Sequence, residues 1–105
     1  MSERGVFEMD LHENEGFRFL AKALLSLESE EECAAFLEDL LTRKELADIV
    51  QRLLVAKMLS EQVVYNKIVE QTGASTATIS RVNRAFHYGA GGYQEILKKI
   101  GEEQV

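Results

Sequence analysis

The fold of this chain is decided by residues 64–84, VYNKIVEQTGASTATISRVNR. The stretch predicts two short helices, about residues 63–71 and 75–88, joined through Gly73. A glycine at that point permits a positive φ at the turn, and the small side chain of Ala74 lets the two helices approach closely. The spacing predicts a helix-turn-helix, while an ordinary corner between two bundle helices would give the same pattern. The side chains expected to pack between the helices are Ile68, Thr72, Ala74, Ile79 and Val82.

The outward side of the second helix begins with short side chains, most of them hydroxylated. A solvated helix face more often carries Glu and Lys, which have better helix propensity. Short hydroxyl groups let a helix enter the major groove of DNA, where Thr can hydrogen-bond base edges. Two arginines follow at positions suited to phosphates or guanine, and the helix N-terminus itself favours an anion. We therefore predict a DNA-binding surface formed by Asn66, Lys67, Ser75, Thr76, Ala77, Thr78, Ser80, Arg81 and Arg84.

The whole sequence predicts an all-α chain of six helices with no strand pattern. Proline is absent and the seven glycines gather at segment ends, so the apolar-periodic stretches are uninterrupted. Ser29 with Glu32 and Thr42 with Glu45 have the spacing of capping boxes, each of which opens a helix. The expected helices span about residues 14–27, 29–41, 42–59, 63–71, 75–88 and 92–100, the last of them stopped at Gly101.

A chain of 105 residues predicts one domain, which we place at residues 14–100. Residues 1–13 are expected to form a flexible acidic tail and residues 101–105 a second tail. Helices within residues 14–59 carry apolar side chains on more than one side, which a small subunit cannot cover alone. Residues 14–59 are therefore expected to form the core of a homodimer, next to a helix-turn-helix at 63–88 and a C-terminal helix at 92–100.

Charge and composition narrow the possible functions. The net charge is −6, but residues 1–50 hold 13 acidic and 5 basic side chains whereas residues 51–105 hold 5 acidic and 7 basic. A surface for a polyanion therefore belongs to the second half. The single cysteine excludes an internal disulfide, and no run is long enough to span a membrane. We expect a cytoplasmic protein that is not an enzyme and has no metal, no cofactor and no catalytic residues.

The sequence resembles the tryptophan-repressor superfamily, and within it most closely the YerC/YecD-type repressor-like proteins. The signature is GASTATISRV at residues 73–82, inside a match that is strongest over residues 51–88. Weaker similarity, including EEC at 31–33 and LT at 41–42, extends over roughly residues 17–98. The resemblance implies an intertwined homodimer of six-helix subunits in which the N-terminal helices of both chains form one core.

The same resemblance implies a possible effector pocket. In the tryptophan repressor two arginines and a leucine-threonine turn hold the ligand. Taking the loop before Val63 as one residue shorter, those positions are occupied here by Leu41, Thr42, Arg52 and Arg81. The repressor has glycine after the second arginine, whereas this chain has Val82, whose methyl groups fill the space beside the indole. A co-repressor is therefore an open expectation and tryptophan is not expected to bind; the alternative is that both arginines pair with helix C-termini or glutamates.

We interpret the chain as a sequence-specific DNA-binding transcriptional regulator of the repressor type. A two-fold dimer would present its second motif helices to major grooves about 34 Å apart, on a near-palindromic double-stranded operator. The alternative is a helical dimeric protein-interaction module without specific DNA binding, in which residues 88–105 are free to bind a partner. The excess of acidic side chains favours this alternative. Binding to duplex DNA that depends steeply on salt distinguishes the two.

Overall fold

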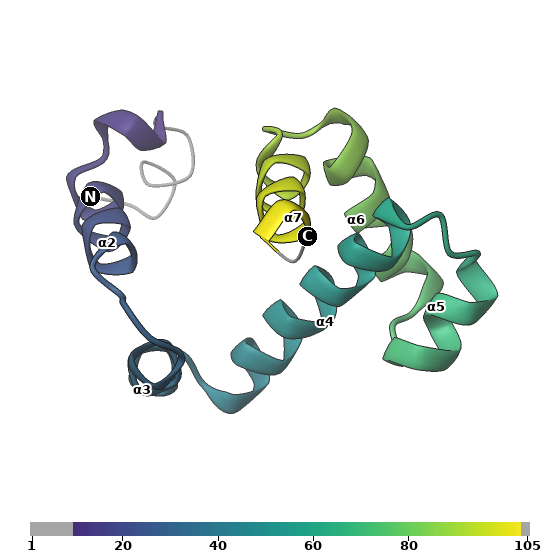
Figure 1. The fold of residues 1–105 in the computed structure, drawn as a ribbon, viewed down its shortest axis with the longest axis horizontal. Coiled ribbons are helices and arrows are strands. Elements are labelled where there is room, and N and C mark those ends of the chain that lie inside the picture. The colour runs from purple at the N-terminus through teal and green to yellow at the C-terminus, as the bar shows by residue number, and fades with distance from the viewer. Residues whose placement is uncertain (1–9, 104–105) are drawn as a thin grey trace. The chain divides into compact units, whose positions relative to one another are not determined.

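The computed structural model describes residues 10–103, which form a short 3-10 helix and six α-helices and contain no strand (Figure 1). The elements are η1 (Leu11–Glu13), α2 (Glu15–Leu25), α3 (Glu30–Leu40), α4 (Arg43–Ser60), α5 (Tyr65–Thr72), α6 (Thr76–Tyr88) and α7 (Gly92–Glu103). The predicted all-α chain of six helices is confirmed. None of these helices is both long enough and apolar enough to cross a lipid bilayer.

The first of two compact units ends at Leu40 and holds η1, α2 and α3. The Asn14 side chain begins α2 by accepting a hydrogen bond from the Phe17 N–H at 2.9 Å. No described side chain of this unit is buried, and Phe19 and Leu25 of α2 are 75% and 86% exposed. The unit therefore leaves much of its apolar surface uncovered.

Only half of the capping box predicted before α3 is present. The Ser29 hydroxyl accepts from the Glu32 N–H at 3.0 Å, as the spacing predicts. The Glu32 carboxylate, however, accepts from the Glu28 N–H at 3.1 Å and not from the N–H of Ser29. This bond, four residues apart, still pairs a backbone amide that would otherwise be free before the helix. The Ser29 hydroxyl and the Glu32 carboxylate therefore both have a partner where α3 begins.

The second unit begins at Leu41 and is built around α4, against which α5, α6 and α7 all pack (Figure 1). The complete capping box predicted for α4 is confirmed. Thr42 Oγ1 accepts from the Glu45 N–H at 3.1 Å, and the Glu45 carboxylate accepts from the Thr42 N–H at 2.9 Å. This reciprocal pair fixes where α4 starts.

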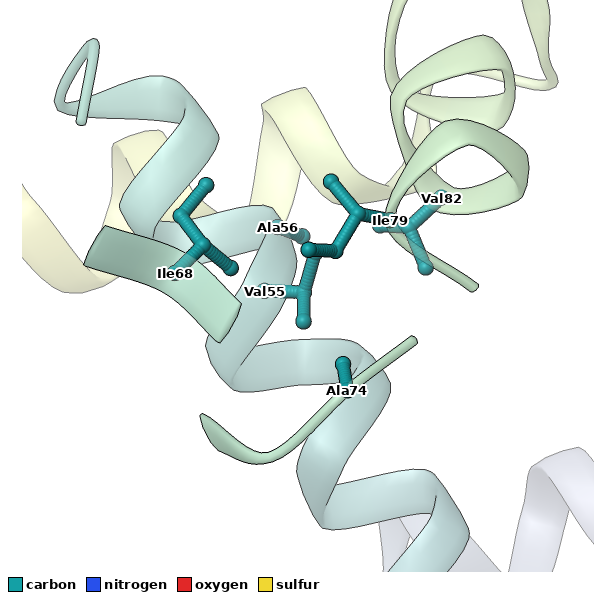
Figure 2. Close-up of a cluster of buried hydrophobic side chains, with 6 residues drawn as sticks. All are labelled: Val55, Ala56, Ile68, Ala74, Ile79 and Val82. Atoms are coloured by element: carbon teal, nitrogen blue, oxygen red, sulfur yellow. The ribbon is translucent and has the colours of Figure 1, made fainter. Parts of the chain in front are cut away.

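The core of this unit is small and entirely apolar (Figure 2). It contains Val55, Ala56, Ile68, Ala74, Ile79 and Val82. Four of these six residues were predicted to pack between α5 and α6. The α4 contribution differs from the expected broad apolar face, because Val55 and Ala56 are buried while Leu53 and Leu54 are 42% and 46% exposed. In this unit, therefore, only a narrow apolar stripe of α4 is buried against α5, α6 and α7.

Helix ends differ from the expectation at both ends of the described chain. Residues 11–13, expected in a flexible tail, form η1, because the Asp10 carboxylate accepts from the His12 N–H at 2.9 Å and closes the turn. The first α-helix ends at Leu25, two residues early, with Ser26 as its cap. Gly101 does not stop α7, which runs to Glu103, because one glycine costs a helix only about 1 kcal/mol. Residues 1–9 and 104–105 of the predicted tails lie outside the described residues, and the single domain at 14–100 stays a prediction.

Gly73 offers a test of the turn between α5 and α6. Its φ is +72° and a Cβ there would meet no atom within 4 Å, so backbone strain is the one cost of a side chain. We expect Gly73→Ala to lower the free energy of unfolding by about 1–2 kcal/mol. Gly92→Ala is the control, since its site is equally open and its φ is ordinary; it should be neutral or stabilising by up to about 1 kcal/mol. Equal urea midpoints for the two variants would contradict the assigned turn geometry.

Candidate nucleic-acid interface

The turn between α5 and α6 is closed by a compact set of hydrogen bonds. The Gly73 N–H donates to the Val69 carbonyl at 2.8 Å with Gly73 in the left-handed region. The Thr72 hydroxyl donates to the Ile68 carbonyl at 2.7 Å and accepts from the Ala74 N–H at 3.1 Å. These bonds use the backbone groups that a helix end leaves free, so α5 stops and α6 starts after only three residues.

Ser75 is the N-cap of α6, and its hydroxyl serves the first turn twice. Its oxygen accepts a hydrogen bond from the Thr78 N–H at 3.1 Å, and its O–H donates to the Thr78 hydroxyl oxygen, also at 3.1 Å. The cap leaves the first turn of α6 well defined. Because α6 itself contains no Asp or Glu, no carboxylate of that helix opposes an anion near its N-terminus.

The two sides of α6 differ sharply. Ile79 and Val82 are 0% and 3% exposed and pack toward α4 (Figure 2). The outward side carries five of the exposed residues of α6, namely Thr76, Ala77, Ser80, Arg81 and Arg84. All five belong to the predicted DNA-binding set, so the geometry brings them together as one stripe on one helix.

Thr78 lies apart from that stripe. It is half-buried, its hydroxyl is engaged with Ser75, and it lines a cleft between α6 and α4. Its side chain is therefore better placed to hold the start of α6 than to meet a base edge. On α5, Asn66 and Lys67 are exposed as the predicted surface requires.

The cleft between α4 and α6 is polar and small. It measures about 190 Å³ and is lined by Asp48, Gln51, Arg52, Thr78 and Arg81. Sites for small molecules usually measure about 300–1,000 Å³. Among residues 10–103, Arg52 and Arg81 form no ion pair; the paired cations are Lys44 with Asp48 and Lys57 with Glu61. Within these residues, neither Arg52 nor Arg81 pairs with a glutamate, as the alternative would require.

The residues predicted for an effector pocket are only partly brought together. Arg52 and Arg81 share the cleft. Thr42 instead caps α4 and Leu41 is half-buried just before it, whereas Val82 belongs to the core. The effector pocket stays a prediction, with two of its five residues in contact with one cavity.

Sequence reasoning missed two residues of this region. Val55 is fully buried beneath α6, and Gln51 donates from its side-chain Nε2 to the Thr72 carbonyl at 3.1 Å. A glutamine in a helix otherwise rich in apolar residues was the available signal. No group of three or more His, Cys, Asp or Glu among the described residues is arranged to hold a metal ion.

Comparison with known proteins decides the family. The family described as Trp repressor protein matches residues 15–101. The chain belongs to the Trp repressor family. The resemblance carried by residues 73–82 and the Trp-repressor-like fold are thereby confirmed.

Individual relatives and solved structures are similar to this chain over most of its length. The uncharacterized protein YerC of Bacillus subtilis (strain 168) is 47% identical over 85 residues, covering 81% of this chain and 82% of YerC. The crystal structure of a TrpR-like protein from Eubacterium eligens ATCC 27750 has 45% identity and a TM-score of 0.82, covering 85% of this chain and 92% of that one. A Staphylococcus aureus protein described as a candidate Trp repressor has 40% identity and a TM-score of 0.83, covering 90% and 96%.

Tryptophan is the obvious ligand to test in a member of the Trp repressor family. Val82 is packed into the core, and the cleft that Arg52 and Arg81 line is polar and small, so we expect millimolar L-tryptophan to leave the melting temperature unchanged. A ligand stabilises the folded state only in proportion to its occupancy. The measurement is thermal unfolding with L-tryptophan, and with L-leucine as the control. A rise specific to tryptophan would contradict the steric argument.

Proposed function

We propose that this member of the Trp repressor family is a sequence-specific DNA-binding transcriptional regulator that reads double-stranded DNA as a homodimer. The observation that carries the proposal is the two-sided character of α6. Its inner side is sealed on α4 by Ile79 and Val82, and its outer side presents short or hydroxylated side chains followed by Arg81 and Arg84. A helix with those two sides can be held rigidly while it lies in a major groove.

The electrostatics of α5 and α6 favour a polyanion despite the acidic chain. From residue 64 to residue 88 the one carboxylate is Glu70, against the cations Lys67, Arg81 and Arg84. The acidic side chains are concentrated in residues 1–50. Phosphate contacts then orient the protein while the short side chains meet base edges. This local balance is what weighs against the protein-interaction module, which the total charge of −6 would favour.

The exposed apolar side chains of each unit support a homodimer. On α2, Phe19 and Leu25 are exposed, and on α4, Ile49, Val50 and Leu53 are 42–48% exposed. Large exposed apolar side chains that are numerous on one helix favour an interaction site. A second copy of the chain provides matching surface by symmetry, and a two-fold pair presents two α6 helices to one duplex.

The regulatory part of the proposal rests on the family. Repression follows when a dimer occupies an operator, and no effector is needed for the contacts described above. A non-enzymatic role fits the same features, as does a cytoplasmic location.

Association is tested first. We expect sedimentation at micromolar concentration to give a species of twice the 11.9 kDa chain mass. Phe19→Glu should weaken this association, because it replaces an apolar side chain that is 75% exposed in the single chain with a charged one. Arg18→Glu, on the neighbouring exposed position of α2, is the control and should leave it unchanged. A folded monomer of the wild-type chain would contradict the dimer.

DNA reading is tested by selecting bound sequences from a random duplex pool and titrating the winner with salt. We expect a near-palindromic sequence and a steep salt dependence. Thr76→Ala should cost about 1–3 kcal/mol on the selected operator and little on unrelated duplex, because it removes a base-edge contact. Arg84→Ala should weaken binding to all sequences and lower the salt slope by about one, because it removes a phosphate contact.

Two outcomes would overturn the proposal. Enrichment of no sequence would favour the protein-interaction module. Equal losses for Thr76→Ala and Arg84→Ala on operator and unrelated duplex would contradict the division of roles along α6.

A further inference from the structure

One side chain of α4 reaches the pair of helices proposed to bind DNA through a hydrogen bond. Gln51 Nε2 donates to the Thr72 backbone carbonyl at 3.1 Å, across 21 residues of sequence. Within residues 10–103 the other side-chain hydrogen bonds join groups at most eight residues apart, as Gln94 does with Phe86. Gln51 is therefore the polar tie between α4 and the α5–α6 pair within that range.

The acceptor of this bond is a helix-terminal group. Thr72 is the last residue of α5, and its carbonyl has no partner further along that helix. The amide of Gln51 supplies the missing donor in a partly buried place, where an unmade hydrogen bond would be costly. The bond thus pairs the free carbonyl at the end of α5 and also attaches that end to α4.

Thr72, which Gln51 holds, is itself bonded to the residue just before the N-cap of α6. The Thr72 hydroxyl accepts from the Ala74 N–H at 3.1 Å, and Ala74 is followed by Ser75, the N-cap of α6. Val82, two turns further along, is 3% exposed and packs in the core with Val55 of α4. The turn before α6 is thus attached to α4 and the middle of α6 packs on α4, and these two contacts together oppose a pivot of α6. The outward stripe of α6 then has a fixed direction.

We propose that Gln51 is a positioning residue for DNA reading: it fixes the orientation of α6 through Thr72, using protein groups alone, so that operator recognition requires no small-molecule effector. The inference rests on the proposed function. It assigns to Gln51 the role of aligning α6 and not of contacting the duplex.

The variants are Gln51→Met, which keeps the length of the side chain but removes the donor, and Gln51→Glu, which replaces the donor with a carboxylate. Gln71→Met is the matched control, because Gln71 is an exposed glutamine of α5 and makes no hydrogen bond to α4. The measurement is the ratio of affinities for the selected operator and for unrelated duplex, with no effector added. Circular dichroism and sedimentation check that each variant is folded and associated as the wild type is.

We expect Gln51→Met to lower the affinity ratio about five- to tenfold, as the loss of one partly buried hydrogen bond implies, with unrelated duplex bound as before. Gln51→Glu should lower it further, because a carboxylate repels the Thr72 carbonyl. Gln71→Met should keep the wild-type ratio. A loss that is equal on both duplexes, or an unchanged ratio in Gln51→Met, would overturn the proposal.

Amide hydrogen exchange provides a readout without DNA. The Ala74 N–H should exchange faster in Gln51→Met than in the wild type, and at the wild-type rate in Gln71→Met. If the wild type selects an operator and neither exchange nor ratio changes in Gln51→Met, the positioning role fails while the proposed function stands. If the wild type selects no operator, the proposed function fails and the reading role of Gln51 fails with it, even where faster exchange shows that the tie exists.

Discussion

Apolar contact between α4 and α6 is the constraint on which the second unit depends. Val55 and Ala56 of α4 meet Ile79 and Val82 of α6, and all four are at most 3% exposed (Figure 2). Burial of an aliphatic side chain of this size contributes about 1.5–3 kcal/mol, so a core of six residues has little to spare. Without this contact the outward stripe of α6 would have no fixed direction, and the cleft between α4 and α6 would not keep its geometry.

The same contact explains how an acidic chain can carry the outward stripe for which we propose DNA binding. The fully buried residues of α6 are apolar, so its exposed polar side chains face outward, and Thr78 and Arg81 line the cleft. Arg81 lies at that edge and on the outward stripe at once. Membership of the Trp repressor family agrees with this arrangement, and Val82 lies in the apolar core.

Sequence reasoning succeeded where the decisive interaction is local. The capping box of Thr42 with Glu45 and the turn at Gly73 depend on residues within a few positions of each other, and both are present. It failed where the decisive partner is distant in the chain. The role of Gln51 depends on its hydrogen bond to Thr72, 21 residues away. Val55 differs from its exposed apolar neighbours on α4 because α6 packs over it. The continuation of α7 past Gly101 reflects a third cause, because a glycine weakens a helix without ending it.

Nuclear magnetic resonance of the labelled protein, titrated with the selected operator duplex, tests most directly that α6 reads DNA. The largest amide shifts should fall on the outward stripe and on the first turn of α5, at Asn66, Lys67, Thr76, Ala77, Ser80, Arg81 and Arg84. The amides of Val55 and Val82 should shift little, because α6 is already fixed on α4 before DNA is added. Shifts centred on α3 or α7, with α6 unperturbed, would contradict the assignment of α6 as the reading helix.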